Sequence, residues 1–367
     1  MDDGADRKTP QAIIERITLT PCDQRQQDPG WKFARGGIPQ IQGWIVTLTS
    51  TSGVQGWGHV LITPIAQPDG ARTRRVLEEA AQAVQGRSAL HQETLHGLLH
   101  EICEGVPCVF SGITSAAMEL CARSLQVPLS ALLGGATRTH IPATRLVPIK
   151  APELMAAEAL RLQAQGYQGL KLKLDGDADT DIARVREVRR AVGPGVLLTV
   201  DANQAYGADT AIDVCEALRP HGIALMEQPV PAADREGLRR VTQRGLLRIE
   251  ADEAIGGSVK TLLELIAMGA AHSYNLKVPY FGGLRSTLVA ARACEAAQVQ
   301  CRLGAIFGPR IASAQAAHLA SVLRSLEGGA EIAESEHLLD DPFTGFDARN
   351  GQLPVCSTPG SGAMPSF

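Results

Sequence analysis

The chain has 367 residues, of which 44% are hydrophobic and 20% are charged, so we expect two or three folded units and exclude wholesale disorder. Its 35 Lys and Arg against 39 Asp and Glu give a net charge of −4, which leaves no broad basic field for a nucleic acid. The acidic stretch Met1–Asp6 lacks the features of a secretion signal, and the longest apolar runs are too short to cross a bilayer. We therefore expect a cytoplasmic protein with no nucleic-acid partner and no membrane partner.

The first part of the chain, residues 1–140, reads as an α+β unit. Two strand-like runs, Ile41–Ser50 and Val54–Val60, flank a polar turn that contains Gly53, which predicts a hairpin. A long helical region follows, from about Arg72 to Leu133. The eight cysteines form no CxxC pair and no zinc-binding spacing, so we expect reduced thiols, most of them buried.

From Thr144 onward, short apolar runs alternate with amphipathic segments, which is typical of successive βα units around a parallel sheet. The first helix of this part is marked by Pro152 at its start and Gly166 at its end. The pattern predicts a TIM-type barrel over 141–338, with a doubly wound sheet as the competing architecture, and a tail, 339–367, that packs back on the first unit. The candidate strands are Arg145–Lys150, Gly169–Leu174, Val196–Ala202, Ile223–Gln228, Leu247–Asp252, Tyr274–Val278, Gln300–Ala305 and Ala330–Ala333.

Two lysines stand on the second candidate strand. Lys171 and Lys173 are two residues apart, so their side chains share one face and project into the barrel. Each ammonium group lowers the pKa of the other and burial adds to this effect, so one lysine can be neutral near pH 7 and act as a general base. On this motif alone, an edge strand with solvated lysines is the alternative.

Each of the next three candidate strands carries a carboxylate at its last or second-last position. Asp201, Glu227 and Asp252 follow one another at spacings of 26 and 25 residues, one βα unit each. Singly, such residues often cap the helix that follows. In register at the carboxyl-terminal rim of a barrel, three carboxylates would repel one another unless a cation lay between them, and their oxygen ligands suit Mg²⁺.

A third lysine, Lys277, follows Asp252 by 25 residues and precedes the pair Gly282-Gly283. It lies four strands from Lys173, across an eight-stranded barrel, and so could reach the opposite face of a bound substrate. Two lysines that flank a metal ion can remove a proton next to a carboxylate and return one, because the ion stabilises the enediolate between the two steps.

These motifs resemble the enolase superfamily and, within it, the muconate-lactonizing-enzyme subgroup. That superfamily is known to pair a lysine or histidine base with Mg²⁺. The resemblance implies an α/β protein with a modified TIM (β/α)7β barrel and an α+β capping domain at the amino terminus. It rests on KLK at 171–173, DAN at 201–203, EQP at 227–229, ADE at 251–253, NLK and GG within 275–283, the glycine-rich segment 53–58, and Pro128 with 132–135.

The resemblance also implies a role for each residue of the predicted site. The Mg²⁺ ligands would be Asp201, Glu227 and Asp252, and the two acid/base residues would be Lys173 and Lys277. Lys171 would lower the pKa of Lys173 and contact the substrate carboxylate. Two further residues, Asn203 and Glu253, would support the ligands from behind.

In relatives of this kind, mobile loops of the capping domain close over the barrel and set specificity. The segment 29–37 is the candidate for such a loop here, with Lys32 and Arg35 as substrate-binding residues, and Arg310 is a third candidate. Two positions depart from the family pattern. Gly308 aligns with a residue that is acidic in many relatives, and His59 stands where Glu is frequent.

We therefore expect a Mg²⁺-dependent isomerase, that is a racemase, epimerase or cycloisomerase, acting on a small-molecule carboxylate. The resemblance further implies a homo-oligomer. The same residues could run a β-elimination, as in the o-succinylbenzoate synthases that the sequence also resembles. A non-catalytic binding protein is the third possibility, although such descendants usually lose a metal ligand or a base, and all five residues are present here.

Overall fold

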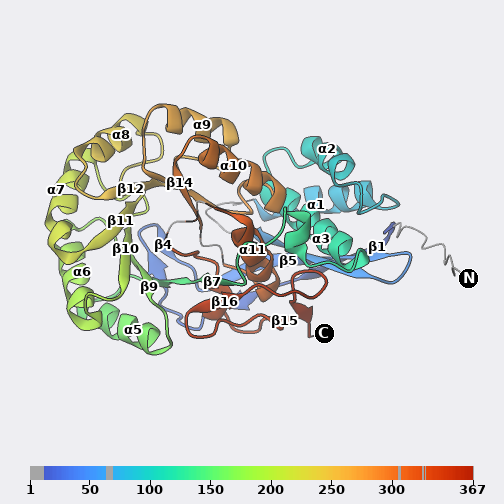
Figure 1. Ribbon diagram of the computed structural model, residues 1–367, viewed down its shortest axis with the longest axis horizontal. Helices are drawn as coiled ribbons and strands as arrows, with labels where there is room; N and C mark the ends of the chain where they lie inside the picture. The colour runs from blue at the N-terminus through green and yellow to red at the C-terminus, as the bar shows by residue number, and fades with distance from the viewer. Residues whose placement is uncertain (1–11, 63–68, 305–306, 325, 327, 367) are drawn as a thin grey trace, which may run out of the picture.

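The computed structural model describes residues 12–62, 69–304, 307–324, 326 and 328–366, and these form an α+β body beside a barrel (Figure 1). The acidic stretch at the amino terminus and residue 305, the predicted end of the seventh strand, lie outside the described residues. Among the described helices, none has the length and apolar character needed to cross a membrane.

The first body is an antiparallel sheet covered by helices. Strands β5 (Gln40–Ser50) and β6 (Gln55–Ile62) form the predicted hairpin, and β1 (Ile14–Pro21) and β2 (Gln24–Arg25) pair with β5 on its other side. The predicted helical region divides into α1 (Gly70–Val84), α2 (Gln92–Ile102), α3 (Pro107–Ser124) and α4 (Leu129–Leu132). A small ribbon of β3 (Lys32–Phe33) and β4 (Gly36–Gly37) carries the predicted loop.

Two glycines explain why α3 lies so close to β6. A side-chain carbon at Gly56 would come within 2.2 Å of the backbone nitrogen of Leu120, and one at Gly58 would come within 2.0 Å of the backbone oxygen of Gly112. Only glycine tolerates such an approach of helix to strand. The glycine-rich motif of the sequence is therefore a packing feature of this body.

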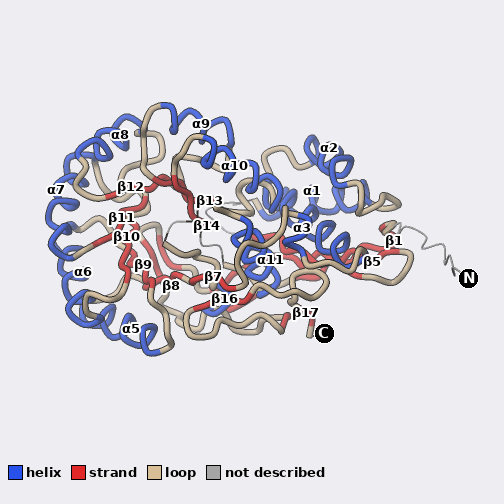
Figure 2. Tube along the Cα trace, viewed as in Figure 1, coloured by secondary structure: helices blue, strands red, loops and turns tan. Residues whose placement is uncertain are grey.

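The second body is a parallel barrel whose strands are hydrogen-bonded in the order β14-β13-β12-β11-β10-β9-β8 (Figures 1 and 2). The apolar residues of each strand face the surrounding helices, so that Leu170 and Leu172 are buried in the main core while the alternating Lys171 and Lys173 point inward. Its strands are β8 (Thr144–Val147), β9 (Gly169–Lys173), β10 (Leu197–Asp201), β11 (Ile223–Glu227), β12 (Arg248–Ala251), β13 (Ser273–Leu276) and β14 (Gln300–Leu303).

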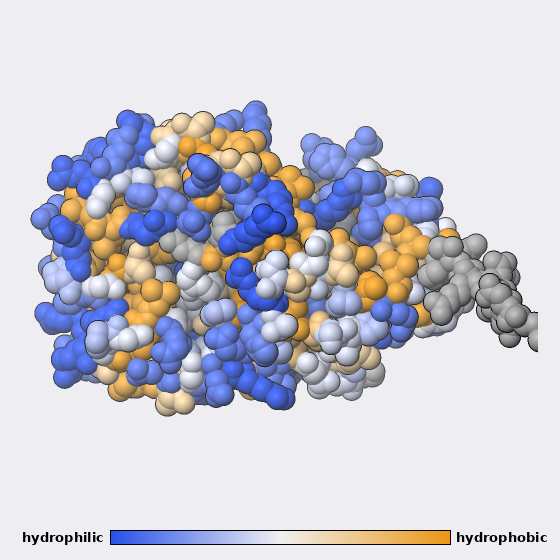
Figure 3. All heavy atoms as spheres, in the orientation of Figure 1, coloured by the Kyte–Doolittle hydropathy of each residue, from blue (hydrophilic) through white to orange (hydrophobic). Residues whose placement is uncertain are grey.

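Local sequence sets the bounds of the helices. Pro152 opens the first helix of the barrel, Gly166 follows its end with a φ of +92°, and the Asp177 side chain caps the next by accepting from the Thr180 amide. Hydrophilic side chains gather along the outer rim of these helices (Figure 3). The helices are α5 (Pro152–Ala164), α6 (Ala178–Val192), α7 (Ala208–Leu218), η1 (Arg219–His221), α8 (Arg235–Arg244), α9 (Val259–Ala267), α10 (Leu284–Ala296), α11 (Arg310–Val322) and η2 (Glu334–His337).

The prediction of an eighth strand at Ala330–Ala333 is wrong, although the segment does lie where the eighth strand of the barrel was expected. Ala330 makes an isolated bridge with Ala143, and the chain turns into η2 directly afterwards. The segment still joins the two edges of the sheet, because Ala330 bonds the backbone of 142 and 144 and the amide of Glu331 donates to the oxygen of Leu303 at 2.9 Å. Ala330 thus bonds the edge at β8 and Glu331 bonds the edge at β14, and we call Ala330–Ala333 the closing segment.

The tail runs back toward the first body. Its strand β16 (Gln352–Pro354) pairs with β7 (His140–Pro142), while β15 (Phe343–Thr344) pairs with β17 (Met364–Pro365). The Ser361 amide donates to the buried Glu119 carboxylate of α3 at 2.9 Å. These contacts support the division at 140 and 338, which stays a prediction. All eight cysteines are free thiols and all but Cys356 are buried, as predicted.

Candidate active site

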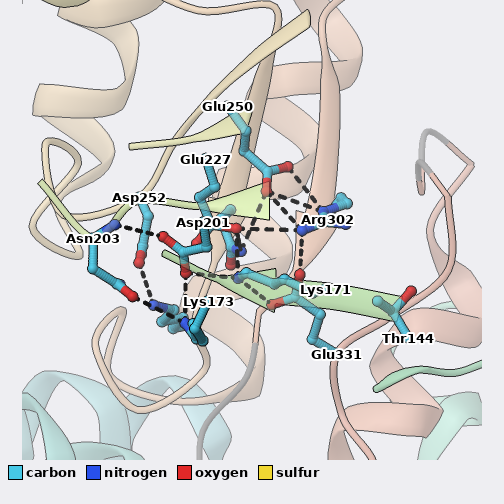
Figure 4. A network of polar contacts seen from close by, with 12 residues as sticks. Thr144, Lys171, Lys173, Asp201, Asn203, Glu227, Glu250, Asp252, Arg302 and Glu331 are labelled. Atoms are coloured by element: carbon cyan, nitrogen blue, oxygen red, sulfur yellow. Dashed lines mark hydrogen bonds and ion pairs between the residues drawn. The ribbon is translucent and has the colours of Figure 1, made fainter. Parts of the chain in front are cut away.

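The three predicted metal ligands lie together with Lys171 and Lys173 at the carboxyl-terminal end of the barrel (Figure 4). Because the strands are parallel and in register, Lys173 lies opposite Asp201, which in turn lies opposite Glu227. Asp252 directly follows β12 and Lys277 directly follows β13. Asp201 and Glu227 have no exposed surface, and Lys173 is only 6% exposed.

Lys173 and Lys277 each pair with a different carboxylate. The Nζ atom of Lys173 lies 2.5 Å from Oδ2 of Asp201 and donates to Oδ1 of Asn203 at 3.2 Å. Lys277 pairs with Asp252, three strands away from the Lys173 pair in the sheet order. Burial opposes the charge on Lys277, but Asp252, Glu227 and Tyr280 outweigh it and raise its pKa.

Lys171 lies deeper, among three carboxylates. Its Nζ atom is 2.6 Å from Glu227, 2.9 Å from Glu331 and 3.2 Å from Asp201, and the side chain is 1% exposed. Burial opposes its charge, but the three carboxylates together raise its pKa well above the ordinary value. The predicted lowering of the pKa within the lysine pair is therefore wrong for Lys171, because the nearby carboxylates act more strongly than the neighbouring ammonium group.

The residues expected to support the ligands are also present at the rim. The Asn203 amide donates to Oδ1 of Asp201 at 2.9 Å, and its side chain donates to Glu253 at 3.2 Å. Asn203 has a φ of +42° and Gln228 a φ of +34°, a left-handed conformation that is strained for both. Gln228 uses it to accept from the amide of Asp252 at 2.9 Å, which fixes the start of that loop.

Sequence reasoning missed a lower layer of charged residues. Glu250, Arg302 and Glu331 have no exposed surface and lie beside the predicted ligands in the same network of polar contacts (Figure 4). The available signal was the period of two along a strand, since Glu250 precedes Asp252 by two residues and therefore shares its face. Glu331 could not be placed in this way, because its segment is not a regular strand.

The charges of this region fit a divalent cation. Four cationic side chains meet six carboxylates, so the fully ionised site carries an excess of two negative charges. The cations are Lys171, Lys173, Lys277 and Arg302, and the carboxylates are Asp201, Glu227, Glu250, Asp252, Glu253 and Glu331. Burial, together with the neighbouring carboxylates, raises the pKa of Glu227 to about 7. Within the described residues, Oε1 of Glu227 is buried and has no hydrogen-bond partner. A carboxylate oxygen in that situation is suited to a metal ion.

Comparison with known proteins agrees with this geometry. Residues 154–366 match the model of the enolase C-terminal domain-like family, and residues 16–134 match the N-terminal domain model of the mandelate racemase / muconate lactonizing enzyme family. A hydrophobic dipeptide epimerase of Enterococcus faecalis is 32% identical over 318 residues, which cover 85% of this chain and 88% of that protein.

The chain belongs to the mandelate racemase / muconate lactonizing enzyme family. It is an isomerase of the enolase superfamily. Muconate cycloisomerase 1 of Pseudomonas putida is 29% identical over 362 residues, which cover 95% of each chain. The crystal structure of a dipeptide epimerase from Enterococcus faecalis V583, complexed with Mg and the dipeptide L-Leu-L-Tyr, has a TM-score of 0.91 at 28% identity and covers 96% of this chain and 99% of that chain.

In this family member, the predicted capping loop spans the barrel mouth. The ring centroid of Phe33 lies 5.8 Å from Nζ of Lys173, and the oxygen of Lys32 accepts from the amide of Ile149 at 3.0 Å. Burial raises the pKa of Tyr280, whose ring centroid lies 5.8 Å from Nζ of Lys277, and the charges of Lys277 and Arg35 oppose this shift. The loop thus contacts Lys173 through Phe33, and among the described residues no contact joins Lys32 or Arg35 to either lysine.

The surroundings of Phe33 are apolar and aromatic. Trp31 packs edge-on against Phe307 with ring centroids 4.8 Å apart, and lies 6.0 Å from the ring of Phe33. Leu146 of β8 belongs to the same buried cluster, and its register partner is Lys171. We call Trp31, Phe33, Leu146 and Phe307 the rim cluster. It places an apolar wall beside the lysines of the family site.

Arg310 is not brought to the lysines. Its Nε atom donates to Asp347 at 3.1 Å and its amide donates to Asp341 at 2.8 Å. Both partners belong to the tail, so the structure gives Arg310 an anchoring contact there. Its contact with substrate stays a prediction that no contact in the described residues supports.

The two positions that depart from the family pattern are neighbours. A side-chain carbon at Gly308 would lie 2.8 Å from Nδ1 of His59, so the imidazole occupies the space that a larger residue at 308 would need. Burial alone lowers the pKa of His59 to about 3, so the ring is neutral at physiological pH. The neutral imidazole and the glycine together leave these two positions without charge.

Proposed function

We propose that this isomerase catalyses Mg²⁺-dependent racemisation or epimerisation at the carbon next to a carboxylate group. The observation that carries the proposal is the separation of the two lysines. Lys173 and Lys277 come from β9 and from the end of β13, and they pair with the different carboxylates Asp201 and Asp252. A base takes only a proton that points toward it, so two bases on opposite sides suit inversion.

The proposed reaction uses the lysines in turn. One lysine, in its neutral form, takes the α-proton, and the electron pair of the broken C–H bond moves into the carboxyl group to give an enediolate. The ammonium group of the other lysine then donates a proton to the opposite face of the same carbon. The products are the inverted substrate and two lysines whose protonation states have been exchanged.

Asp201, Glu227 and Asp252 are the proposed ligands of the ion. A divalent cation there would neutralise charge on the substrate carboxylate and so stabilise the enediolate. The chain contributes the positions of these side chains: strand register holds Asp201 beside Glu227, and Gln228 fixes the backbone at Asp252. Lys171 holds Asp201 and Glu227 together from below.

The proposed substrate is a dipeptide or another α-amino carboxylate with an apolar side chain. The rim cluster supports this class, because its aromatic rings face the lysine side of the barrel mouth and carry no charge. The similarity to Enterococcus faecalis V583 points the same way, since a relative there is named a hydrophobic dipeptide epimerase and a dipeptide epimerase of that strain was crystallised with L-Leu-L-Tyr.

A panel of dipeptides and N-acyl amino acids in D₂O tests the proposal. We expect deuterium at the α-carbon together with the inverted configuration, detected by NMR and chiral chromatography, and faster exchange for apolar side chains.

Cycloisomerisation is the second candidate, because muconate cycloisomerase 1 matches 95% of this chain. A lactone formed from a muconate, with no exchange across the panel, would establish it in place of epimerisation, and an unsaturated product would favour the lyase alternative.

A further inference from the structure

Arg302 lies at the centre of the lower charged layer. It comes from β14 and has no exposed surface, like Glu250 of β12 and Glu331 of the closing segment. A buried arginine is costly unless its charge is paired. The Nε and Nη2 atoms of Arg302 have carboxylate partners, whereas Nη1 has no hydrogen-bond partner within the described residues. Figure 4 shows the partners gathered on one side of it, between the strands and the closing segment.

One guanidinium group serves three carboxylates. The Nε atom of Arg302 lies 3.0 Å from both oxygens of Glu250, and its Nη2 atom lies 3.3 Å from Oε2 of Glu227. Nη2 also donates to Oε1 of Glu331. A guanidinium is planar, keeps its charge at all relevant pH values and offers five N–H donors, so it can neutralise several carboxylates at once.

The same three carboxylates have the spacing of a metal site. One oxygen from each of Glu227, Glu250 and Glu331 lies within 4.8 Å of the others, and all three side chains are buried. By spacing alone, this trio could hold a divalent cation. The positive charge that the trio needs is already supplied by Arg302, with Lys171 paired to Glu227 and Glu331.

Glu227 belongs to both layers. Its Oε2 atom is engaged from below by Lys171 at 2.6 Å, by Arg302 at 3.3 Å and by Asn275 at 3.1 Å. Its Oε1 atom has no hydrogen-bond partner within the described residues. The lower layer therefore uses one oxygen of Glu227 and leaves the other for the upper layer of Asp201 and Asp252.

We propose that Arg302 is an internal cation that restricts the site to one metal ion. Its guanidinium group supplies the positive charge that a second ion would otherwise supply between Glu227, Glu250 and Glu331. The single ion therefore binds at the upper carboxylates. Arg302 is on this view a positioning residue that acts through Glu227. The inference rests on the metal ligands of the proposed function, and it goes further by giving Arg302 a role in keeping a second ion out of the lower carboxylates.

Binding of Mn²⁺ tests this without any measurement of activity. Isothermal titration calorimetry and electron paramagnetic resonance should show one Mn²⁺ per chain in the wild-type protein. R302M should bind two, and two ions that share Glu227 should be spin-coupled, which removes the six-line spectrum of isolated Mn²⁺. A stoichiometry of one in folded R302M, at any affinity, overturns the proposal.

Two further variants keep the test decisive if R302M does not fold. R302K retains a positive charge and should bind one ion. E250M/R302M removes the cation together with one of the three carboxylates, so it should also bind one ion, within about fivefold of the wild-type affinity. Loss of that ion from the folded double variant would mean that Arg302 supports the upper ligands directly, which also overturns the proposal.

Failure of the proposed function gives a different result. If wild-type protein binds no Mn²⁺, or if Asp201→Asn leaves Mn²⁺ binding unchanged, the upper ligand set is wrong whatever Arg302 does. If the wild-type protein binds one ion that Asp201→Asn weakens, the ligand set holds, and the R302M and E250M/R302M results judge the role of Arg302 alone.

Discussion

The strand ends of the barrel and the loop above them are built from different chemistry. The strand ends carry ionised side chains in pairs, such as Lys173 with Asp201 and Lys277 with Asp252, held by backbone register. The loop contributes Trp31 and Phe33, which meet the strand-end residues through ring faces and apolar contacts. The difference teaches that the proposed proton transfer would depend on side chains fixed by the sheet, while the proposed choice of substrate would depend on the loop above it.

The largest effect should follow from removing a proposed metal ligand at a strand end. Asp201→Asn, Glu227→Gln and Asp252→Asn should each reduce turnover about 10³–10⁴-fold, because a Lewis acid supplies several kcal/mol to the transition state and each 1.4 kcal/mol is tenfold in rate. Steady-state kinetics and Mg²⁺ titration measure this, with circular dichroism to check the fold. Near wild-type activity in any variant removes that residue from the ligand set.

The next effect separates the two lysines. Lys173→Ala should lose about 10³-fold in α-proton exchange for one configuration of the substrate, and Lys277→Ala should lose as much for the other, because each base reaches one face. Deuterium wash-in for both enantiomers measures this. Lys260→Ala is the matched control, since Lys260 is exposed on the outer helix α9 and should leave both rates unchanged. If both alanine variants lose exchange for the same enantiomer, the opposite-face assignment is wrong.

A smaller effect should come from the rim cluster. Phe33→Ala should lower kcat/KM about 10–100-fold for substrates with large apolar side chains and much less for small ones, because it removes apolar contact area without removing a charge. Phe33→Leu should retain most of the activity. An equal loss of kcat/KM for every substrate would show that Phe33 acts on the lysines themselves. The loop would then take part in the proton transfer, which contradicts the proposed division between sheet and loop.

The smallest effect concerns Glu334, which lies beside the rim cluster on η2. Burial, with a further contribution from Glu331, raises its pKa to about 7, although Arg145 opposes the shift. A raised folded-state pKa means that its stabilising contribution is complete below about pH 4.5 and is lost as the pH rises through about 7. Glu334→Gln does not titrate, so relative to wild type it should gain about 2–3 kcal/mol of stability between pH 4.5 and 8.

Urea unfolding of the wild type and of Glu334→Gln at both pH values, with EDTA present, measures that gain. Glu336→Gln is a suitable control, because Glu336 lies on the same short helix and is partly exposed. A stability difference that does not change with pH would contradict the sign derived for Glu334.

The sequence by itself determined the residues of the proposed chemistry. Periodicity of two places Lys171 and Lys173 on one face of a strand, and the repeat of about 25 residues brings Asp201, Glu227 and Asp252 to the same end of a parallel sheet. Both are local rules, since each depends only on the strand and the βα unit in which the residue stands. The hairpin and the barrel could be predicted for the same reason.

Tertiary structure alone decided how these charges are balanced. Glu331 reaches Lys171 across 160 residues of sequence from a segment that is not a strand, and Arg302 meets Glu250 from two strands away. The raised pKa of Lys171 likewise depends on carboxylates from distant parts of the chain, and His59 meets Gly308 from another body of the fold. Electrostatic interactions in a buried site depend on every charge within several ångströms, and no local pattern in the sequence records which charges those are.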